Sequence, residues 1–497
     1  MAIRSCCSLS VTLSLLVLAT SGCGTAIHGE DESPATSTQE GEIRIANSLT
    51  TQALVLNAIS ANLDSNRKLS QQSLQSLFDP AGGDANTRRR LGDPKAQQLM
   101  SYLVGCALNQ GDSVNWFDPL TFTARRWYGQ AGLCPSWGTA APTADCLERV
   151  SSCLLARNNA LGRRVELSMR GEHQLWPAGP NIYTLEPQTR PADHHPTTSQ
   201  PLASFLPCSP TTQQGPGRDC GWKADGIGYC AASGPVQVGA GGLTSCPGPA
   251  PALGSSNMQT VLRVCSGVNG CDHADARNLG EATGSCAGIS PVPVVSFTCT
   301  AGQFFSVMAA PFSASTTSAL LPNVAASPSN VVSYGLSETE VYTEREGAFY
   351  GNVFDYKALA RGVNVDVVQY GQGREARYVV VGADVEIKGS VYTRMFSCYD
   401  PTWANGPAYS SHRLCALPGS GANCAATVTG ACFTSLNPPV PGKCAIDEGS
   451  MTEGDRDYEE CEDPLGNVWW HPVTTFLHSA CDAVPPPRQG LLTCGQK

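Results

Sequence analysis

Charged side chains are scarce in this chain of 497 residues. Aspartate, glutamate, lysine and arginine make up 15% of it, whereas typical soluble domains hold about 25%. The 42 acidic residues outnumber the 32 basic ones, which gives a formal net charge of −10. An acidic surface repels nucleic acid phosphates, and no basic stripe with interleaved aromatic residues occurs in the sequence. The composition therefore argues against nucleic-acid binding.

Long apolar runs are missing beyond the N-terminus. The run from Leu9 to Ala19 is too short to span a bilayer, because a membrane-spanning helix needs about 20 apolar residues. Arg4 precedes this run, and a cation followed by a short apolar segment is typical of a secretory signal peptide. The sequence predicts export without a transmembrane helix.

Recognisable catalytic motifs are also missing: the sequence contains no G-x-S-x-G elbow, H-E-x-x-H pair or Walker A loop. Gly284–Gly288 is a cysteine version of the elbow, but in an exported chain Cys286 is read as half of a disulfide. Ser65 and Lys68 fit the S-x-x-K pattern of penicillin-recognising enzymes without its companion motifs, which favours chance. A Ser-His-Asp triad stays open, because triads are assembled in space.

Metal-binding patterns are few. The chain has eight histidines and no C-x-x-C pair after residue 23, which argues against zinc-finger and thioredoxin-like sites. Asp455, Asp457 and Glu459 alternate in a short acidic stretch, and closely spaced carboxylates suit calcium. We predict this set as a candidate calcium site, although an acidic run is more often a solvated face. Asp272, His273 and Asp275 are a second candidate metal site. Asp193, His194 and His195 lie in a loop that we expect to be exposed and to bind no metal.

Cysteine, by contrast, is abundant, with 23 residues. Three of them lie within residues 1–23, and the other twenty form three even-numbered clusters. We therefore predict three separately closed, disulfide-bonded segments, with the pairing left open. Each bridge stabilises a fold by about 2–4 kcal/mol, which suits a chain with 50 glycines and 35 prolines. The clusters are Cys106, Cys134, Cys146 and Cys153; Cys208, Cys220, Cys230, Cys246, Cys265, Cys271, Cys286 and Cys299; and Cys398, Cys415, Cys424, Cys432, Cys444, Cys461, Cys481 and Cys494.

Hydrophobic periodicity predicts an α+β protein, with a helical N-terminal segment and a disulfide-rich β-sandwich-like body. We expect one amphipathic helix over 49–63, a second that begins at Asp93-Pro94, and a third capped by Thr143. The aromatic residues between these helices are expected to be core rather than a sugar-binding stripe. They are Trp116, Phe117, Phe122, Trp127, Tyr128 and Trp137.

The periodicity changes to two from Val165 onward, which predicts strands. The predicted division is a flexible tether at 23–42, a helical segment at 43–164, a β-rich domain at 165–400 and a Cys-rich segment at 401–497. The main predicted strands are Thr260–Cys265, Val292–Thr300, Phe304–Ala309, Val363–Tyr370, Tyr378–Ile387 and Val391–Phe396.

The residues that follow the apolar run, Thr20-Ser21-Gly22-Cys23, resemble the lipobox of bacterial lipoproteins. The resemblance implies cleavage of residues 1–22 as a signal peptide and acylation of Cys23, which anchors the protein to a membrane. The chain has Thr20 where the family usually has leucine, and cleavage after Ala26 is the alternative. Gly24 is not the aspartate that retains lipoproteins at the inner membrane, so the outer membrane or cell surface is the expected location.

Several stretches of the chain resemble large Cys-rich secreted proteins of myxobacteria, a resemblance that brings no catalytic residue with it. They are YLVGCAL at 102–108, ERVSSCLLARNN at 148–159, VELSMRG at 165–171 and EGAFYGNVF at 346–354.

Taken together, these features predict a non-enzymatic envelope lipoprotein. It is expected to bind a glycan, a protein partner or the envelope itself, or to be a structural surface protein. No cofactor is expected apart from the candidate calcium. The alternative is a lipid-anchored hydrolase that acts on polysaccharide or peptide, with carboxylates about 5–10 Å apart. A deep pocket with two facing carboxylates would favour the hydrolase, and a shallow aromatic face would favour binding.

Overall fold

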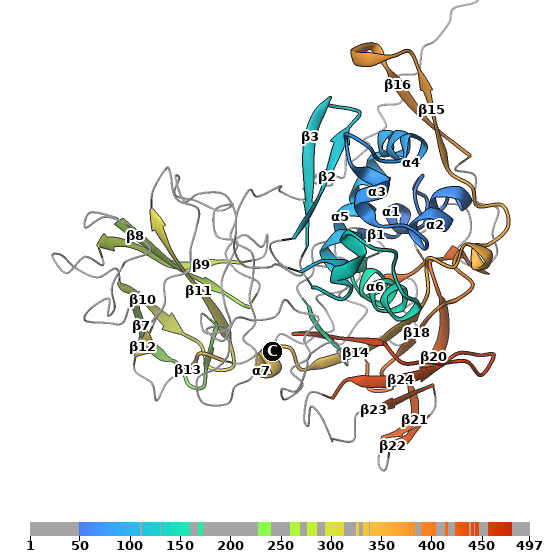
Figure 1. The fold of residues 1–497 in the computed structure, drawn as a ribbon. Helices are drawn as coiled ribbons and strands as arrows, with labels where there is room; N and C mark the ends of the chain where they lie inside the picture. The colour runs from blue at the N-terminus through green and yellow to red at the C-terminus, as the bar shows by residue number, and fades with distance from the viewer. Residues whose placement is uncertain are drawn as a thin grey trace, which may run out of the picture. The chain divides into compact units, whose positions relative to one another are not determined.

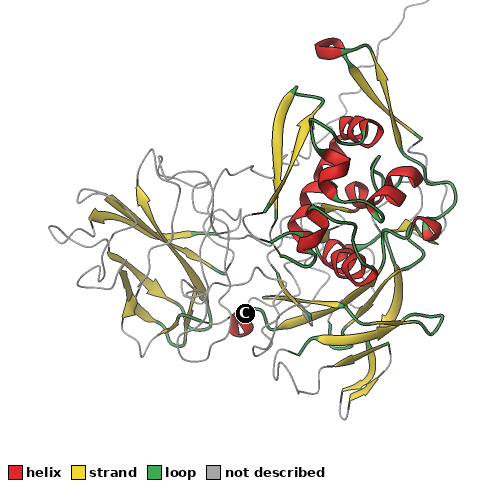
Figure 2. Ribbon diagram, in the orientation of Figure 1, coloured by secondary structure: helices red, strands yellow, loops and turns green. Residues whose placement is uncertain are grey.

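Helices and strands both contribute to the fold, with most of the helix before residue 160 and mainly strands after it (Figure 2). The protein is α+β in this coarse sense. The computed structural model describes residues 49–109, 112–129, 131–159, 167–171, 227–239, 259–268, 276–285, 294–312, 325–327, 332–336, 338–382, 389–403, 413–415, 423–436, 439–441, 443–446 and 456–479. Among these residues, no helix combines the length and the apolar character needed to cross a membrane.

The helical part of the protein consists of short helices and two longer ones, α5 and α6 (Figure 1). A short parallel pair, β1 (Leu49–Thr50) and β4 (Asn158–Asn159), joins its two ends. The helices are α1 (Thr51–Val55), α2 (Leu63–Leu69), α3 (Leu74–Phe78), α4 (Ala85–Arg89), the 3-10 turn η1 (Arg90–Gly92), α5 (Pro94–Ala107), the 3-10 turn η2 (Pro135–Gly138) and α6 (Ala144–Ala156).

The two longer helices begin where the sequence predicted. The Asp93 carboxylate accepts a hydrogen bond from the Lys95 amide, and Pro94 is the first residue of α5. Thr143 caps α6 by accepting from the amide of Cys146. The Cys106–Cys153 bridge joins the two helices.

The single helix predicted over 49–63 is wrong, because the chain leaves the helix after Val55 and starts a new one at Leu63. Asn57 provides the physical reason. Its amide nitrogen donates to the carbonyls of Ala53 and Leu54, and its amide oxygen accepts from the backbone N–H of Ile59 and Ser60. A buried asparagine thereby replaces helical hydrogen bonds with local ones. The apolar residues Leu49, Ala53, Leu56 and Ile59 are buried, whereas Leu63 is exposed.

The predicted helical segment also contains a β-hairpin that the sequence analysis did not anticipate. Strands β2 (Ser113–Asp118) and β3 (Thr123–Tyr128) pair antiparallel. Trp116 and Trp127 stack with ring centroids 4.5 Å apart and are buried, as is Trp137. The core assignment therefore holds for these three tryptophans. It is wrong for Phe117, which is exposed.

A five-stranded sheet in the order β20-β18-β14-β26-β5 packs against α6. The amide of Val353, just after β14, donates to the Ser151 hydroxyl on α6 at 3.0 Å. The sheet combines segments from both sides of residue 400. Its strands are β5 (Ser168–Arg170), β14 (Glu344–Gly351), β18 (Met395–Tyr399), β20 (Thr427–Ala431) and β26 (Val473–Leu477).

Two other sheets share one buried cluster that includes Val238, Val264 and Phe305. The Cys230–Cys299 bridge connects them. One sheet is β13 (Val332–Tyr334), β6 (Ile227–Cys230), β11 (Phe304–Phe312), β8 (Gln259–Ser266) and β9 (Asn278–Ser285); the other is β10 (Val294–Cys299), β7 (Gly234–Gly239) and β12 (Ala325–Ser327). The predicted strands at 260–265, 292–300 and 304–309 correspond to β8, β10 and β11.

Smaller elements complete the described fold. The hairpin β15 (Asp366–Tyr370) and β16 (Arg377–Val381) overlaps the strands predicted at 363–370 and 378–387. Of the strand predicted at 391–396, residues 391–394 are instead a turn that leads into β18. The remaining elements are α7 (Glu338–Val341), η5 (Tyr356–Ala358), η6 (Gly373–Glu375), β17 (Gly389–Ser390), β19 (Asn423–Cys424), β21 (Phe433–Leu436), β22 (Pro439–Pro441), β23 (Cys444–Ile446), β24 (Tyr458–Glu462) and β25 (Val468–Trp469).

One turn type recurs at all five Asp-Pro dipeptides of the sequence. In each, the aspartate carboxylate accepts a hydrogen bond of 2.8–3.0 Å from the backbone N–H two residues later. Proline fixes its own backbone angle, and aspartate closes the turn from its side chain. The five aspartates are Asp79, Asp93, Asp118, Asp400 and Asp463.

Candidate functional site

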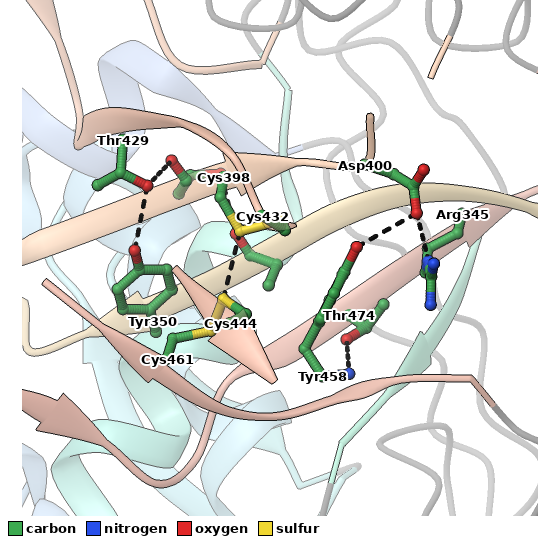
Figure 3. Close-up of a disulfide and its surroundings, with 12 residues drawn as sticks. Arg345, Tyr350, Cys398, Asp400, Thr429, Cys432, Cys444, Tyr458, Cys461 and Thr474 are labelled. Carbon is green, nitrogen blue, oxygen red and sulfur yellow. Dashed lines mark hydrogen bonds and ion pairs between the residues drawn. A yellow bond between two sulfur atoms is a disulfide. The ribbon is translucent and has the colours of Figure 1, made fainter. Parts of the chain in front are cut away.

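Disulfides dominate the C-terminal part of the described chain. Cys398–Cys432 and Cys444–Cys461 lie side by side in the core, with the sulfurs of Cys398 and Cys444 3.3 Å apart (Figure 3). Three of these sulfurs form the one close group of potential metal ligands among the described residues. Their disulfide bonds leave no thiolate to bind a metal, so the arrangement is a structural cross-link.

All thirteen cysteines in the described part of the chain are in disulfides, as the sequence analysis predicted for them. The first cluster closes on itself through Cys106–Cys153 and Cys134–Cys146. The bridges with both partners described in the later clusters also stay within their own cluster: Cys230–Cys299, Cys398–Cys432, Cys415–Cys424 and Cys444–Cys461. Outside the described residues are Cys23, Cys208, Cys220, Cys246, Cys271, Cys286, Cys481 and Cys494.

A buried polar centre lies next to the stacked disulfides (Figure 3). One Asp400 oxygen accepts hydrogen bonds from the Arg345 guanidinium and, at 3.2 Å, from the Tyr458 hydroxyl. Arg345 also lies 4.8 Å above the Tyr458 ring. Burial raises the pKa of Tyr458 well above its ordinary value, so the phenol stays protonated. The centre links β14, β18 and β24; Asp400 and Tyr458 are buried, and Arg345 is partly exposed.

The structure separates the residues of the candidate calcium site by environment. Asp457, just before β24, is buried, and Glu459, two residues later on β24, is half-buried. Among the described residues, no third carboxylate, histidine or thiol lies close enough to complete a site with them. Asp455 lies outside the described residues, so the calcium site stays a prediction. The sets at 193–195 and 272–275 also lie outside them.

The S-x-x-K residues make separate structural contacts. The buried Ser65 hydroxyl accepts a hydrogen bond from Arg90 at 2.8 Å. The Lys68 amine binds the Asp84 carboxylate at 2.9 Å and Asp64 at 3.1 Å. Both residues therefore support the packing of α2 against its neighbours.

An exposed apolar surface occurs at the hairpin of β24 and β25. Asp463 organises its turn by accepting hydrogen bonds from the Leu465 amide, from both nitrogens of Asn467 and from the Trp469 indole. The turn leaves Leu465 86% exposed and Trp470 56% exposed. We call the exposed side chains Leu465, Val468 and Trp470 the tryptophan patch.

A half-buried carboxyl group adjoins the tryptophan patch. Glu148, on α6, accepts hydrogen bonds from the backbone N–H groups of His471, at 3.1 Å, and Trp470. Burial raises the pKa of Glu148 to about 7, although these two hydrogen bonds oppose the increase. Glu148 therefore exchanges a proton near neutral pH, which is a property of carboxyl groups that act as general acids or as pH-dependent ligands.

The polar surroundings of Trp469 add a cation and a second carboxylate. The Arg394 guanidinium lies 5.2 Å above the Trp469 ring and pairs with Asp355 at 3.1 Å. Trp469 is itself buried, so these groups hold the strand in place. The candidate for stacking with a sugar ring is the neighbouring Trp470, whose indole is exposed and whose backbone N–H binds the Glu148 carboxyl group.

Sequence reasoning missed this site. Trp469-Trp470 follows an Asp-Pro-Leu-Gly turn, which is a readable signal for an exposed hairpin. Glu148 gave no signal, because only the fold brings α6 next to residues 470 and 471. Searches for similar proteins found no matching family model, no matching curated protein and no matching solved structure.

Proposed function

We propose that the chain is an exported lipoprotein, anchored through acylated Cys23 to the outer membrane or cell surface. The lipobox-like residues 20–23 after a short apolar run carry this proposal. The disulfides of the described part support it, because such bridges form and persist in oxidising, extracytoplasmic compartments. The body is then a helical segment with a disulfide-rich, β-sandwich-like remainder, held on a tether of residues 23–42.

The proposed activity of the body is binding, with an envelope glycan as the ligand. The tryptophan patch carries this proposal. The Trp470 indole is 56% exposed and directly follows β25, and four hydrogen bonds to Asp463 fix the turn that leads into β25. A preformed aromatic surface loses little conformational freedom on binding. Glu148, which accepts a hydrogen bond from the Trp470 backbone N–H, supplies a carboxyl group nearby for the hydroxyl groups of a saccharide.

Replacement of the indole tests the binding proposal. We expect Trp470→Ala to weaken co-sedimentation of the purified protein with peptidoglycan or isolated envelope polysaccharide by at least about tenfold, since buried aromatic contacts dominate such interfaces. Tyr370→Ala is the matched control, because Tyr370 is an equally exposed aromatic residue on another hairpin. Equal binding by Trp470→Ala and the parent protein would remove the tryptophan patch as the ligand site.

The raised pKa of Glu148 favours one alternative, a lipid-anchored hydrolase in which Glu148 is the general acid. The same preparations separate the two functions. Release of new reducing ends from the polysaccharide, lost in Glu148→Gln, would establish hydrolysis. Binding without release of reducing ends would favour the binding protein.

A further inference from the structure

Two exposed hairpins are fixed to one short segment of the helical part, residues 85–97. The Gln97 amide donates to Asp118 at the end of β2 at 3.3 Å. The Arg90 guanidinium donates to Asp366 at the start of β15 at 3.0 Å. Gly92 lies against the Tyr378 ring of β16 so closely that an added Cβ would be 2.6 Å from it. The hairpins β2–β3 and β15–β16 are therefore anchored at neighbouring points.

The tip of the β2–β3 hairpin presents apolar side chains to solvent. Leu120 is 44% exposed, and Phe117 is also exposed and packs edge-on against Phe122 at 6.3 Å. Asp118 fixes this turn by accepting from the Leu120 amide at 2.9 Å. Phe122 has a φ of +55°, which bulky residues rarely adopt. The turn thus holds its apolar side chains in a defined, outward arrangement.

The β15–β16 hairpin presents a second apolar surface. Val368 pairs directly with Val379, and strand alternation puts Tyr370 and Val381 on the same face. All four side chains are exposed, with Tyr370 at 59%. Among the described residues no third strand pairs with this hairpin, although an isolated hairpin is marginally stable in water. A surface of this kind marks an interaction site.

The same region is basic within an acidic protein. Residues 85–97, 113–128 and 366–381 together contain eight cationic and four acidic side chains, whereas the whole chain has a net charge of −10. Arg126, Arg374 and Arg377 are all exposed. The cations are Arg88, Arg89, Arg90, Lys95, Arg125, Arg126, Arg374 and Arg377.

We infer that these two hairpins and residues 85–97 form a surface that lies on a lipid bilayer with anionic headgroups. Apolar and aromatic side chains next to arginines match the two layers of a membrane interface, which are the acyl boundary and the phosphates. This inference rests on the proposed lipid anchor, because the 25 residues between Cys23 and Leu49 limit the body to at most about 90 Å from the bilayer. A weak contact then suffices, since anchoring makes it intramolecular.

The test uses the mature chain with Cys23→Ser, so that no acyl chain contributes. We expect this protein to co-sediment with vesicles of phosphatidylethanolamine and phosphatidylglycerol, more weakly at high salt and more weakly with phosphatidylcholine vesicles. Leu120→Asp should reduce the partition coefficient about tenfold, and Arg126→Glu should reduce it and weaken its salt dependence. Leu465→Asp is the matched control: it makes the same change in another exposed Asp-Pro-Leu turn, outside the basic region.

Thermal unfolding of each variant shows whether it is folded, and sedimentation velocity shows whether it self-associates. Equal partition of the Leu120→Asp and Leu465→Asp proteins would overturn the inference, as would partition that ignores lipid charge. A dimer of the parent protein that Leu120→Asp dissociates would also overturn it, because a second copy would then cover the hairpins. Absence of acylation in the native protein would instead count against the proposed lipid anchor and leave this vesicle measurement interpretable.

Discussion

At the scale of single residues, aspartate followed by proline is the most informative signal in this chain. The five Asp-Pro turns share one hydrogen bond but differ in what they support. Asp93 starts α5, Asp400 joins three strands, and Asp463 shapes the turn that displays the tryptophan patch. Of these turns, only Asp93-Pro94 was predicted from the sequence, as the start of a helix. All five turns could be predicted from sequence, because the interaction is local; the further partners of Asp400 could not, since they come from distant segments.

Glu148 makes a specific prediction about pH. The pKa of its carboxyl group is raised from an ordinary 4.5 to about 7 by burial. Between these two values the folded state holds a proton that the unfolded state has lost. This carboxyl group therefore lowers the free energy of unfolding as the pH rises from about 4.5 to about 7. We expect Glu148→Gln to remove this part of the pH dependence. The free energy of unfolding of the variant, compared with that of the parent protein at the same pH, should therefore be more favourable at pH 8 than at pH 4.

Urea unfolding at several pH values measures the effect. Glu375→Gln serves as the control, because Glu375 is exposed at the tip of the β15–β16 hairpin and contributes no comparable burial. A Glu148→Gln protein whose stability parallels that of the parent at every pH would show that Glu148 is not buried as described.

At the scale of elements, the sequence predicted the long helices well and the interrupted ones poorly. Asp93-Pro94 and Thr143 marked the starts of α5 and α6 because capping depends on neighbouring residues. The apolar spacing over 49–63 was correct for burial up to Ile59 and wrong for the exposed Leu63. It did not form one helix, because Asn57 competes for the backbone. The aromatic residues at 116–128 alternate in burial along a strand pair. The pairing of β2 with β3 was not predicted from the sequence.

The β15–β16 hairpin depends on close contact with η1. An added Cβ at Gly92 would meet the near atoms of the Tyr378 ring, which cannot move without shifting β16. We expect Gly92→Ala to lower the midpoint of thermal unfolding and to speed backbone hydrogen exchange in residues 366–381. Gly82→Ala is the matched control, because no atom lies within 4 Å of its added Cβ. Unchanged exchange in the hairpin of Gly92→Ala would contradict the contact.

At the scale of the whole molecule, the grouping of the described disulfides was predictable, and the sheets were not. Even-numbered clusters indicated bridges within each cluster, and every bridge with both partners described obeys this rule. The sheet β20-β18-β14-β26-β5 combines strands near residues 169, 348, 397, 429 and 475. Such long-range pairing leaves no local pattern, and for the same reason the contact of Glu148 on α6 with residues 470 and 471 could not be predicted from the sequence.

The central claim, an exported lipoprotein stabilised by disulfides, is tested most directly by intact and peptide mass spectrometry of the protein purified from its native membrane, with and without reductant. We predict a mature N-terminus at acylated Cys23, no alkylatable thiol before reduction, and the six bridges described above. An unacylated N-terminus after Ala26 would contradict the lipid anchor. Several free thiols would contradict the disulfide framework.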